Sequence, residues 1–322
     1  MHKNSLVSIA MCTYNGERFI QEQIDSILEQ SHSNFELIIT DDCSSDKTIE
    51  IIKNYQENDM RIKLYQNEVN LGFVKNFEKA ISLCNGEYIA LADQDDIWKK
   101  NKLKIFIENI GENALIYSDA LLIDEHSESM GKELIRPRKE LVSGSKNRAF
   151  LVENCVSGNT LMFKKELVQY ILPIPDVSFH DIWIAFVAST YSSITFTDEP
   201  MTYYRRYSEQ ITKKREKNYE GFFDRLKKKK ELKVKSARGS VKDLNTFLSL
   251  NILKNEETKE ILEILIKHYE NYEHLFFNKT LYQILKKYKD DIFEISKKNK
   301  RDKKVIRTAM GLKIHTITLF VL

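Results

Sequence analysis

The sequence has few of the residues that constrain a fold covalently. It contains four cysteines in 322 residues, and none of them belongs to a Cys-x-x-Cys pair. Neither a zinc site nor a disulfide framework is therefore indicated, and we expect buried free thiols in a reducing compartment. The four prolines all precede residue 201, so the last third has no proline to interrupt its helices.

Long hydrophobic runs are also absent. No stretch of about 18 apolar residues occurs, so we expect no transmembrane helix. The apolar stretch Leu6–Cys12 is too short for the core of a signal peptide, and we therefore expect a cytoplasmic protein. A hydrophobic content of 42% and a charged content of 30% indicate a globular chain.

The charge is unevenly distributed although the net charge is only +3. Residues 213–304 hold 26 Lys and Arg against 15 Asp and Glu, whereas the preceding part is acidic. This change predicts a first domain at residues 1–212 and a basic helical domain at residues 213–322. Nucleic-acid binding is not expected, because the aromatic residues of the basic part follow helical packing instead of forming a stacking platform.

The basic domain leaves two kinds of partner open. Its lysines and the apolar chain end Leu319–Leu322 would suit an anionic membrane surface, such as the inner face of a plasma membrane. The same residues could instead pack on protein, either within the helical domain or at an interface between copies of the chain. The pattern alone does not separate these two hypotheses.

The first 120 residues alternate apolar runs with segments of helical periodicity. The runs predict buried strands at Leu6–Met11, Leu37–Thr40, Ile62–Tyr65, Tyr88–Ala92 and Ala114–Tyr117. The segments between them predict helices at Glu17–Glu29, Asp46–Glu57, Val74–Cys84 and Lys99–Ile110. This alternation is typical of a Rossmann-like α/β fold with a mostly parallel sheet, in which ligands bind beyond the carboxyl ends of the strands.

The later part of the chain is less regular. We expect a helix near Lys146–Val152, a strand at Val156–Phe163, a helix at Asp181–Thr190, and strands at Ser193–Phe196 and Met201–Tyr204. From about residue 213 the pattern is helical throughout. Tyr269, Tyr272 and Phe276, and then Leu281 and Leu285, fall at three- and four-residue steps, as in a helix that packs on a neighbour.

An acidic run follows the predicted strand Tyr88–Ala92. Asp93, Asp95 and Asp96 place three carboxylates within four residues, and they would repel one another without a cation. Mg²⁺ and Mn²⁺ prefer carboxylate oxygens and often bridge to phosphates. The alternative is a helix start decorated with acids. That alternative explains Asp95 and Asp96 but not Asp93, so metal binding and a structural role both stay open at this point.

Two further polar segments follow predicted strands. Asp41 and Asp42 stand after the second strand, where they could accept hydrogen bonds from a base imide or a ribose hydroxyl. An ordinary turn with a capping residue is the alternative, and it accounts for Ser45 and Asp46. After the first strand comes the segment Thr13-Tyr14-Asn15-Gly16-Glu17.

Taken together, these segments resemble the family 2 glycosyltransferases of the GT-A fold. The resemblance spans roughly residues 5–210 and is closest to bacterial enzymes that build O-antigen, capsule or wall polysaccharides, rhamnosyltransferases among them. Its order and spacing are more specific than any one segment. The matching segments are Ser8–Glu17, Asp41–Asp46, Asn70-Leu71-Gly72 with Asn76, Asp93–Trp98, Ser157–Thr160 and His180–Trp183.

The resemblance implies a role for each matching residue. Asp181 would be the catalytic base and Asp95 the ligand of Mg²⁺ or Mn²⁺. The nucleotide-sugar site would comprise Thr13, Tyr14, Asn15, Glu17, Asp41, Asp42, Asn76, Asp93 and Gln94. Gly158, Asn159, His180 and Trp183 would lie on the acceptor side. Asp96 is interpreted as a helix-start residue, and a helix cap is the alternative for Asp181.

One segment departs from the family pattern. Tyr204-Arg205-Arg206-Tyr207 has Tyr207 where the family often has His, which puts metal dependence in doubt. Arg suits phosphate geometry, so Arg205 or Arg206 is predicted to stabilise the leaving phosphates.

The resemblance therefore implies an inverting, metal-dependent glycosyltransferase. The donor would be a UDP- or dTDP-sugar, and the acceptor a glycan or lipid-linked glycan. An inactive scaffold with the same fold is the alternative, although the joint presence of Asp42, Asp95 and Asp181 counts against it. A sugar nucleotidyltransferase would need a Gly-rich, Arg-bearing loop after the first strand, where only Gly16 precedes Arg18.

Overall fold

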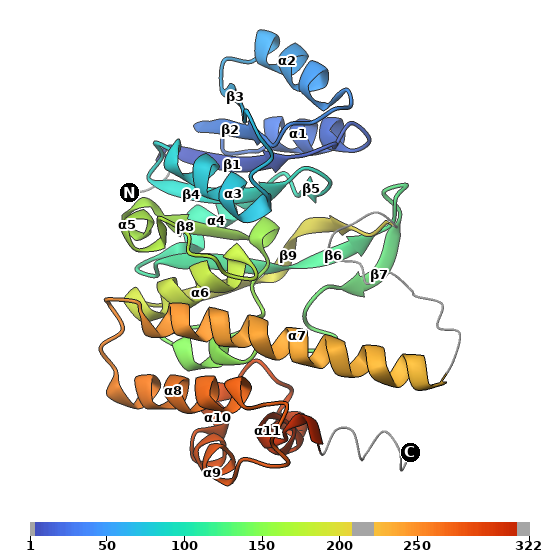
Figure 1. Cartoon of the computed structure of the whole chain (residues 1–322). Helices are drawn as coiled ribbons and strands as arrows, with labels where there is room; N and C mark the ends of the chain where they lie inside the picture. Colours follow the sequence, from blue (N-terminus) through green and yellow to red (C-terminus); the bar gives the residue numbers. More distant parts are fainter. Residues whose placement is uncertain (1–3, 208–221, 314–322) are drawn as a thin grey trace. The chain divides into compact units, whose positions relative to one another are not determined.

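The computed structural model describes residues 4–207 and 222–313. It divides into two compact units, shown in Figure 1. The sheet unit comprises Met1–Lys146, Cys155–Pro175 and Phe179–Ser208, and the helical unit comprises Asn147–Asn154, Asp176–Ser178 and Glu209–Leu322. The domain boundary predicted after residue 212 lies outside the described residues.

The sheet unit is built around one mixed sheet. Its nine strands within the described ranges follow the order β3-β2-β1-β4-β8-β6-β9-β5, with β7 beside β6. They are β1 Val7–Thr13, β2 Phe35–Asp41, β3 Ile62–Gln66, β4 Tyr88–Asp93, β5 Ile97–Trp98, β6 Leu115–Ile123, β7 Ser129–Glu133, β8 Leu161–Lys164 and β9 Ile194–Arg205. Parallel pairing joins β1 to β2 and β4, and β2 to β3, whereas β8 runs antiparallel between β4 and β6. The predicted α/β fold is confirmed.

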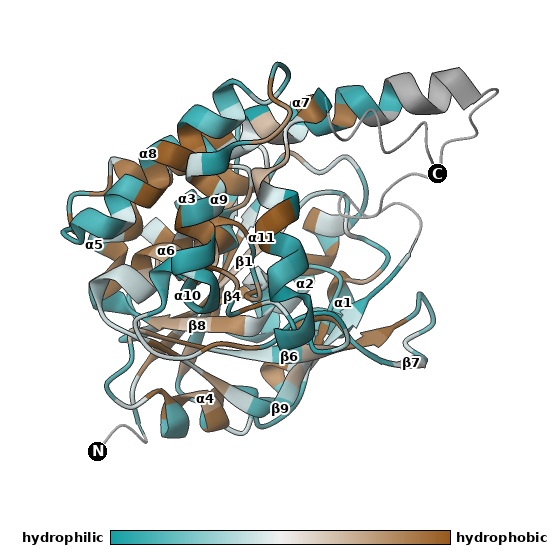
Figure 2. Cartoon of the chain, turned by 90° about the horizontal axis from the view of Figure 1, so that it is seen from below, coloured by the Kyte–Doolittle hydropathy of each residue, from teal (hydrophilic) through white to brown (hydrophobic). Residues whose placement is uncertain are grey.

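Helices accompany the sheet. They are α1 Ile20–Leu28, α2 Thr48–Asn58, α3 Phe73–Ser82, α4 Lys102–Ile110, the short α5 Val168–Ile171, and α6 His180–Tyr191, with the 3₁₀ turns η2 Gly158–Thr160 and η3 Lys165–Leu167. Strand β8 is apolar along its visible length in Figure 2, whereas α4 shows both hydrophobic and hydrophilic segments. A buried strand and a helix with one buried face give these two patterns.

Two predicted strands differ from the structure. Only Leu161–Lys164 of the segment Val156–Phe163 is a strand, because Gly158–Thr160 forms a 3₁₀ turn. The two strands predicted after residue 193 are one strand, β9, whose register against β6 shifts between Ser118 and Ala120. Pro200 lies within this shift, and a proline cannot donate to the ladder of a sheet.

The helical unit contains α7 Phe222–Leu248, α8 Glu256–Glu270, α9 Lys279–Lys287, α10 Lys289–Ile292 and α11 Arg301–Ala309, with the 3₁₀ turns η1 Asn147–Leu151 and η4 Lys298–Lys300. The helix predicted through Tyr269 and Leu285 is wrong, since α8 ends at Glu270 and α9 starts at Lys279. The side chain of Asn278 caps the second helix by accepting a hydrogen bond from Leu281 N. None of the described helices is long and apolar enough to cross a membrane.

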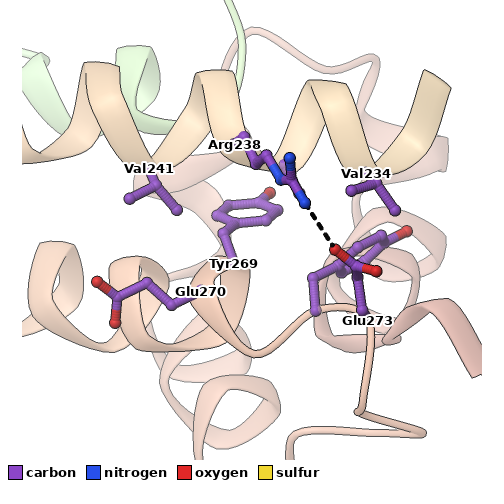
Figure 3. Close-up of a pocket in the computed structure, with 8 residues that line it drawn as sticks. Val234, Arg238, Val241, Tyr269, Glu270 and Glu273 are labelled. Carbon is purple, nitrogen blue, oxygen red and sulfur yellow. Dashed lines mark hydrogen bonds and ion pairs between the residues drawn. The ribbon is translucent and has the colours of Figure 1, made fainter. Parts of the chain in front are cut away.

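A small open pocket lies between α7 and α8 of the helical unit (Figure 3). Its volume is about 220 Å³, below the range of about 300–1,000 Å³ that small-molecule sites occupy. Arg238 and Glu273 form an ion pair across it at 3.3 Å. The pocket contains none of the residues that the sequence singles out for chemistry.

Candidate active site

The strand order reverses beside β1, and the predicted site residues lie at that point. β2 and β3 lie on one side of β1, and β4 lies on the other. The register pairs Thr13 of β1 with Asp41 of β2, and Cys12 of β1 with Asp93 of β4. Three strand ends therefore bring polar residues from distant segments to one edge. In open α/β sheets such an edge is where ligands bind.

Asp41 organises the loop that follows β2. It is fully buried, and its carboxylate accepts hydrogen bonds from Thr13 Oγ1 at 2.8 Å, Ser44 N at 2.8 Å and Ser44 Oγ at 2.5 Å. A buried carboxylate needs such partners to offset its desolvation. Asp41 thus fixes the shape of this loop, and protein donors already occupy most of its acceptor capacity.

Asp42 holds the loop between β3 and α3. Its Oδ1 accepts from Asn67 Nδ2 at 2.8 Å and Leu71 N at 2.7 Å, and its Oδ2 accepts from Gly72 N at 2.9 Å. Asn76 supports this arrangement, because its Oδ1 accepts from Asn67 Nδ2 and its Nδ2 donates to Thr40 O, both at 2.9 Å. A carboxylate can accept about four hydrogen bonds, so Asp42 retains capacity for a ligand donor.

The segment after β1 is tied to the acidic run by Gln94. Its Oε1 accepts from Tyr14 N at 2.8 Å, and its Nε2 donates to Tyr14 O at 3.0 Å. Gly16 makes room for this strap, because a Cβ atom there would lie 2.3 Å from Gln94 Oε1. Tyr14 stays 49% exposed at this edge.

Asn15 and Glu17 bind the loop that follows β2. Asn15 has a φ of +48°, which Asn tolerates better than most residues, and its Oδ1 accepts from Ser45 N at 2.8 Å. Glu17 Oε2 accepts from Lys47 N at 2.9 Å. Both residues were predicted in the nucleotide-sugar site, and both join the loops that surround it.

Asp93 and Asp181 are two acids whose pKa values are raised in the folded chain. Burial, together with the negative charges of Asp95 and Asp181, raises the pKa of Asp93 to about 7, although Lys102 opposes this. Burial raises the pKa of Asp181 to about 6, against a hydrogen bond from Ile182 N and the charge of Lys139. Because the charge of Asp181 acts on Asp93, the start of α6 lies near the end of β4. Raised carboxyl pKa values are typical of sites that handle protons or cations.

Asp95 contacts Tyr207, the residue that departs from the family pattern. The hydroxyl of Tyr207 donates to Asp95 Oδ2 at 2.8 Å, and its ring lies 4.9 Å from that of Phe19. Burial and the charge of Asp95 raise the pKa of Tyr207, so the phenol stays protonated as a donor. Tyr207 therefore orients Asp95, a contact that the sequence did not predict.

Asp96 differs from its prediction as a helix-start residue. Helix α4 begins only at Lys102, and Asp96 is fully buried. Its carboxylate accepts from Asn159 Nδ2 and, at 3.1 Å, from Arg205 N. Burial raises the pKa of Asp96 and lowers that of Lys102, because it disfavours the charged form of each.

Lys102 and Asn159 complete this interior cluster. Lys102 donates to Asn159 O at 2.7 Å and lies 3.6 Å from the centre of the Trp98 ring. Asn159, predicted on the acceptor side, is fully buried and holds Asp96 instead. Lys102 was missed, since a lysine in an amphipathic helix ordinarily faces water.

Arg205 is not arranged as predicted for a phosphate ligand. It is fully buried, its Nε donates to Asp95 O at 2.8 Å, and one NH2 group donates to Glu22 at 3.0 Å. The other donates to Ser127 Oγ at 2.9 Å, and the guanidinium lies 4.4 Å from the Phe19 ring centre. Its geometry fixes the backbone of the acidic run, because these protein groups hold the guanidinium inside.

His180 and Trp183 enter the interior from α6. Neither ring nitrogen of His180 has a hydrogen-bond partner among the described residues, and burial lowers its pKa to about 4. Gly158 admits the ring, because a Cβ atom there would lie 2.7 Å from His180 Nε2. Trp183 donates to Ile171 O at 3.0 Å in the core. Gly158 and Trp183, both predicted on the acceptor side, therefore contribute to the packing of α6.

Asp93 and Asp95 suit a divalent cation whose remaining ligands come from substrate phosphates. In the part of the chain that the structure describes, no three His, Cys, Asp or Glu side chains form a metal cluster. Mg²⁺ is commonly held by one or two carboxylates together with substrate phosphates, and Asp93 and Asp95 supply that number. Burial, followed by the charges of Asp95 and Asp181, raises the pKa of Asp93, and a cation at this edge would favour its ionised form. These residues therefore fit Mg²⁺ or Mn²⁺.

Comparison with known proteins gives a consistent result. The model of glycosyl transferase family 2 matches residues 8–170. A putative teichuronic acid biosynthesis glycosyltransferase of Bacillus subtilis, TuaG, is 39% identical over 35% of this chain, a segment that spans 45% of TuaG. The dTDP-rhamnosyl transferase RfbG of Shigella flexneri is 32% identical over 61% of this chain and 71% of its own length.

Solved structures show the same architecture. The structure of Staphylococcus aureus TarS 1-349 in complex with UDP-GlcNAc superposes with a TM-score of 0.56, and the match covers 94% of this chain and 89% of that one. The two sequences are 19% identical. The likeness therefore concerns the fold.

Proposed function

The chain belongs to glycosyl transferase family 2, and we propose that it moves one sugar from a nucleoside diphosphate sugar to a hydroxyl group of a surface polysaccharide, with inversion at the anomeric carbon. The observation that carries this proposal is the acidic cluster of Asp93, Asp95 and Asp181. It lies at the switch point of the sheet, beside the loops that Asp41 and Asp42 hold. Sugar transfer needs a base for the acceptor and charge neutralisation for the diphosphate. This cluster can provide the base directly and the neutralisation through a cation that it holds.

Asp181 acts as the base. With a pKa of about 6 it is mostly ionised at neutral pH, yet it is more basic than an ordinary aspartate. Its carboxylate takes the proton of the acceptor hydroxyl while the hydroxyl oxygen forms a bond to the anomeric carbon. The bond from that carbon to the diphosphate breaks on the opposite face. A positioned general base contributes about 10²–10⁴-fold to the rate.

The donor lies along the ends of β1, β2 and β4. The nucleoside is contacted by Thr13 and Tyr14, and Asp42 accepts one further hydrogen bond from it. Asp93 faces the ribose and diphosphate. Asp95, together with Asp93, holds Mg²⁺ or Mn²⁺, which when bound acts as a Lewis acid for the departing diphosphate. Arg205 and Tyr207 keep Asp95 in place.

The names of the relatives support a polysaccharide product. TuaG is named for teichuronic acid and RfbG for dTDP-rhamnosyl transfer. By analogy we propose a UDP- or dTDP-sugar as donor and a glycan or lipid-linked glycan as acceptor. The basic helical unit would rest on an anionic membrane surface or on a second copy of the chain. The apolar chain end that suggested this docking lies outside the described residues.

The test starts from a thermal-shift screen of UDP-, dTDP- and GDP-sugars with Mn²⁺. The donor that stabilises the protein is then used to measure nucleoside diphosphate release in wild type and in Asp181→Asn. We expect a rate loss of about 10²–10⁴-fold with donor affinity nearly unchanged. Asp198→Asn is the matched control, because the Asp198 side chain is 94% exposed. Equal turnover by Asp181→Asn would remove Asp181 from the role of base.

A further inference from the structure

Two large aromatic side chains stand exposed on the sheet unit near the start of α6. Phe179, two residues before Asp181, is 48% exposed, and Phe73, the first residue of α3, is 36% exposed. Although they come from distant segments, their ring centres lie only 5.9 Å apart. Apolar surface that is left in water on a preformed pair is typical of a place where a ligand binds.

The rings of His180 and Phe77 support the pair from the interior. The ring of His180 lies 6.1 Å from that of Phe73, edge-on, and stacks on Phe77 at 4.2 Å. Phe77 and His180 are both buried, at 2% and 7% exposure. Burial favours the neutral form of His180, so the rings that support the pair carry no charge. Phe73 is therefore held in place from beneath and does not hang free in solvent.

Both ends of the pair are joined to the candidate active site. Phe73 directly follows Leu71 and Gly72, whose backbone N–H groups donate to Asp42. Phe179 directly precedes His180 and Asp181 at the start of α6. The two rings thus connect the segment that Asp42 anchors with the residue proposed as the base.

We propose that Phe73 and Phe179 form an aromatic platform on which the pyranose ring of the acceptor stacks. A pyranose presents a face of C–H groups that packs on aromatic rings, while its hydroxyl groups remain free at the rim. Stacking next to Asp181 places one of these hydroxyls within reach of the base. The inference rests on the proposed function, because a glycosyl acceptor is what must bring a hydroxyl to Asp181.

Methyl pyranosides provide the probe. Saturation-transfer NMR is recorded with methyl β-D-glucopyranoside, methyl N-acetyl-β-D-glucosaminide and methyl α-L-rhamnopyranoside, in the presence of UDP and Mn²⁺. We expect Phe179→Ala and Phe73→Ala to reduce the signal of the best-binding pyranoside at least about fivefold, and Phe179→Tyr to retain it. Tyr191→Ala is the control, since Tyr191 is an aromatic residue of 36% exposure at the other end of α6.

Binding of the nucleotide sugar is measured on the same variants by thermal shift. Unchanged donor binding with a lost pyranoside signal supports the platform. A pyranoside signal that survives Phe179→Ala, a signal absent from wild type, or a loss of donor binding in Phe179→Ala would each overturn it. Failure of the wild type to bind any nucleotide sugar contradicts the proposed function instead, so the two failures are distinguishable.

Discussion

The two sides of the acidic edge treat their carboxylates in different ways. At the end of β2, Asp41 and Asp42 each accept three hydrogen bonds from protein donors. At the end of β4 and the start of α6, Asp93 and Asp181 have pKa values raised to about 7 and about 6, chiefly because they are buried. The protein thus supplies most of the donors on the β2 side, whereas on the β4–α6 side Lys102 and Lys139 only partly offset the effect of burial.

This difference distinguishes carboxylates that stabilise loops from carboxylates that take part in the reaction. A carboxylate whose lone pairs are filled by backbone and hydroxyl donors shapes a loop and adds to stability. A carboxylate that is buried among other acids costs stability and becomes useful when a proton, a cation or a substrate arrives. The β2 side should therefore respond to mutation mainly in stability, and the β4–α6 side mainly in activity.

The largest stability effect is expected for Asp41→Asn. The amide keeps only one acceptor oxygen, and its NH₂ group would face Thr13 and Ser44, which are donors now. We expect the free energy of unfolding to fall by about 2–3 kcal/mol in urea titrations. Asp59→Asn is the control, because Asp59 pairs with Arg61 in a partly exposed ion pair worth about 1 kcal/mol or less. Equal losses in the two variants would contradict the assignment of Asp41.

Asp93→Asn is expected to raise the free energy of unfolding, the opposite of the effect of Asp41→Asn. A carboxyl group whose pKa rises from 3.8 to about 7 on folding binds its proton more tightly in the folded state. Stability is therefore fully present below about pH 4 and is lost as the pH rises toward 7. At pH 8 we expect the variant to be more stable than wild type by on the order of 1–3 kcal/mol. At pH 4 the two should be alike.

Thermal unfolding between pH 4 and pH 8 checks this prediction. The midpoint temperature of wild type should fall with rising pH more steeply than that of Asp93→Asn. Parallel curves for the two proteins would show that folding does not raise the pKa of Asp93. The contrast with Asp41 would then disappear.

The rate of transfer should depend on the ionisation of Asp181. The base form accumulates above its pKa of about 6, so the turnover rate should rise between pH 5 and pH 7 and then level off. At pH 5 we expect it to be about tenfold below the plateau. Turnover is measured at saturating donor, with donor affinity determined at each pH. A rate that is flat across this range would exclude a base with this pKa.

The smallest effect is expected for Gly16→Ala. The new Cβ atom would displace the flexible end of Gln94 and break its two hydrogen bonds to Tyr14. Because these bonds are exposed, we expect a loss of about 1 kcal/mol and a few-fold weaker donor binding. Gln94→Ala removes the same strap, so the double variant should be no worse than either single one. Additive losses of stability would contradict the conclusion that both substitutions act through the Gln94–Tyr14 hydrogen bonds.

Part of this arrangement is predictable from local sequence. The apolar run before Asp93 and the alternation of strands and helices placed Asp41, Asp42 and Asp93 at strand ends, because register and topology follow from periodicity. The interior cluster was not predictable. Lys102 and Asn159 look like surface residues in sequence, and only their contact across distant segments reveals that both are fully buried.

The same limit applies to Arg205 and Tyr207. Their residue types suggested phosphate binding and a lost metal contact, but side-chain partners decide their roles. Arg205 is held by Asp95 O, Glu22 and Ser127, and Tyr207 by Asp95. Such partners lie far apart in the chain, and no local pattern encodes them.

A calorimetric titration tests the central claim that the β4–α6 side is completed by a ligand and its cation. The nucleotide sugar selected by the thermal-shift screen is titrated into wild type, Asp95→Asn and Asp198→Asn, with Mn²⁺ and then with excess chelator. The account predicts tight binding to wild type and Asp198→Asn in Mn²⁺, and a loss of at least about tenfold on chelation or in Asp95→Asn. Equal affinity under all these conditions would contradict it.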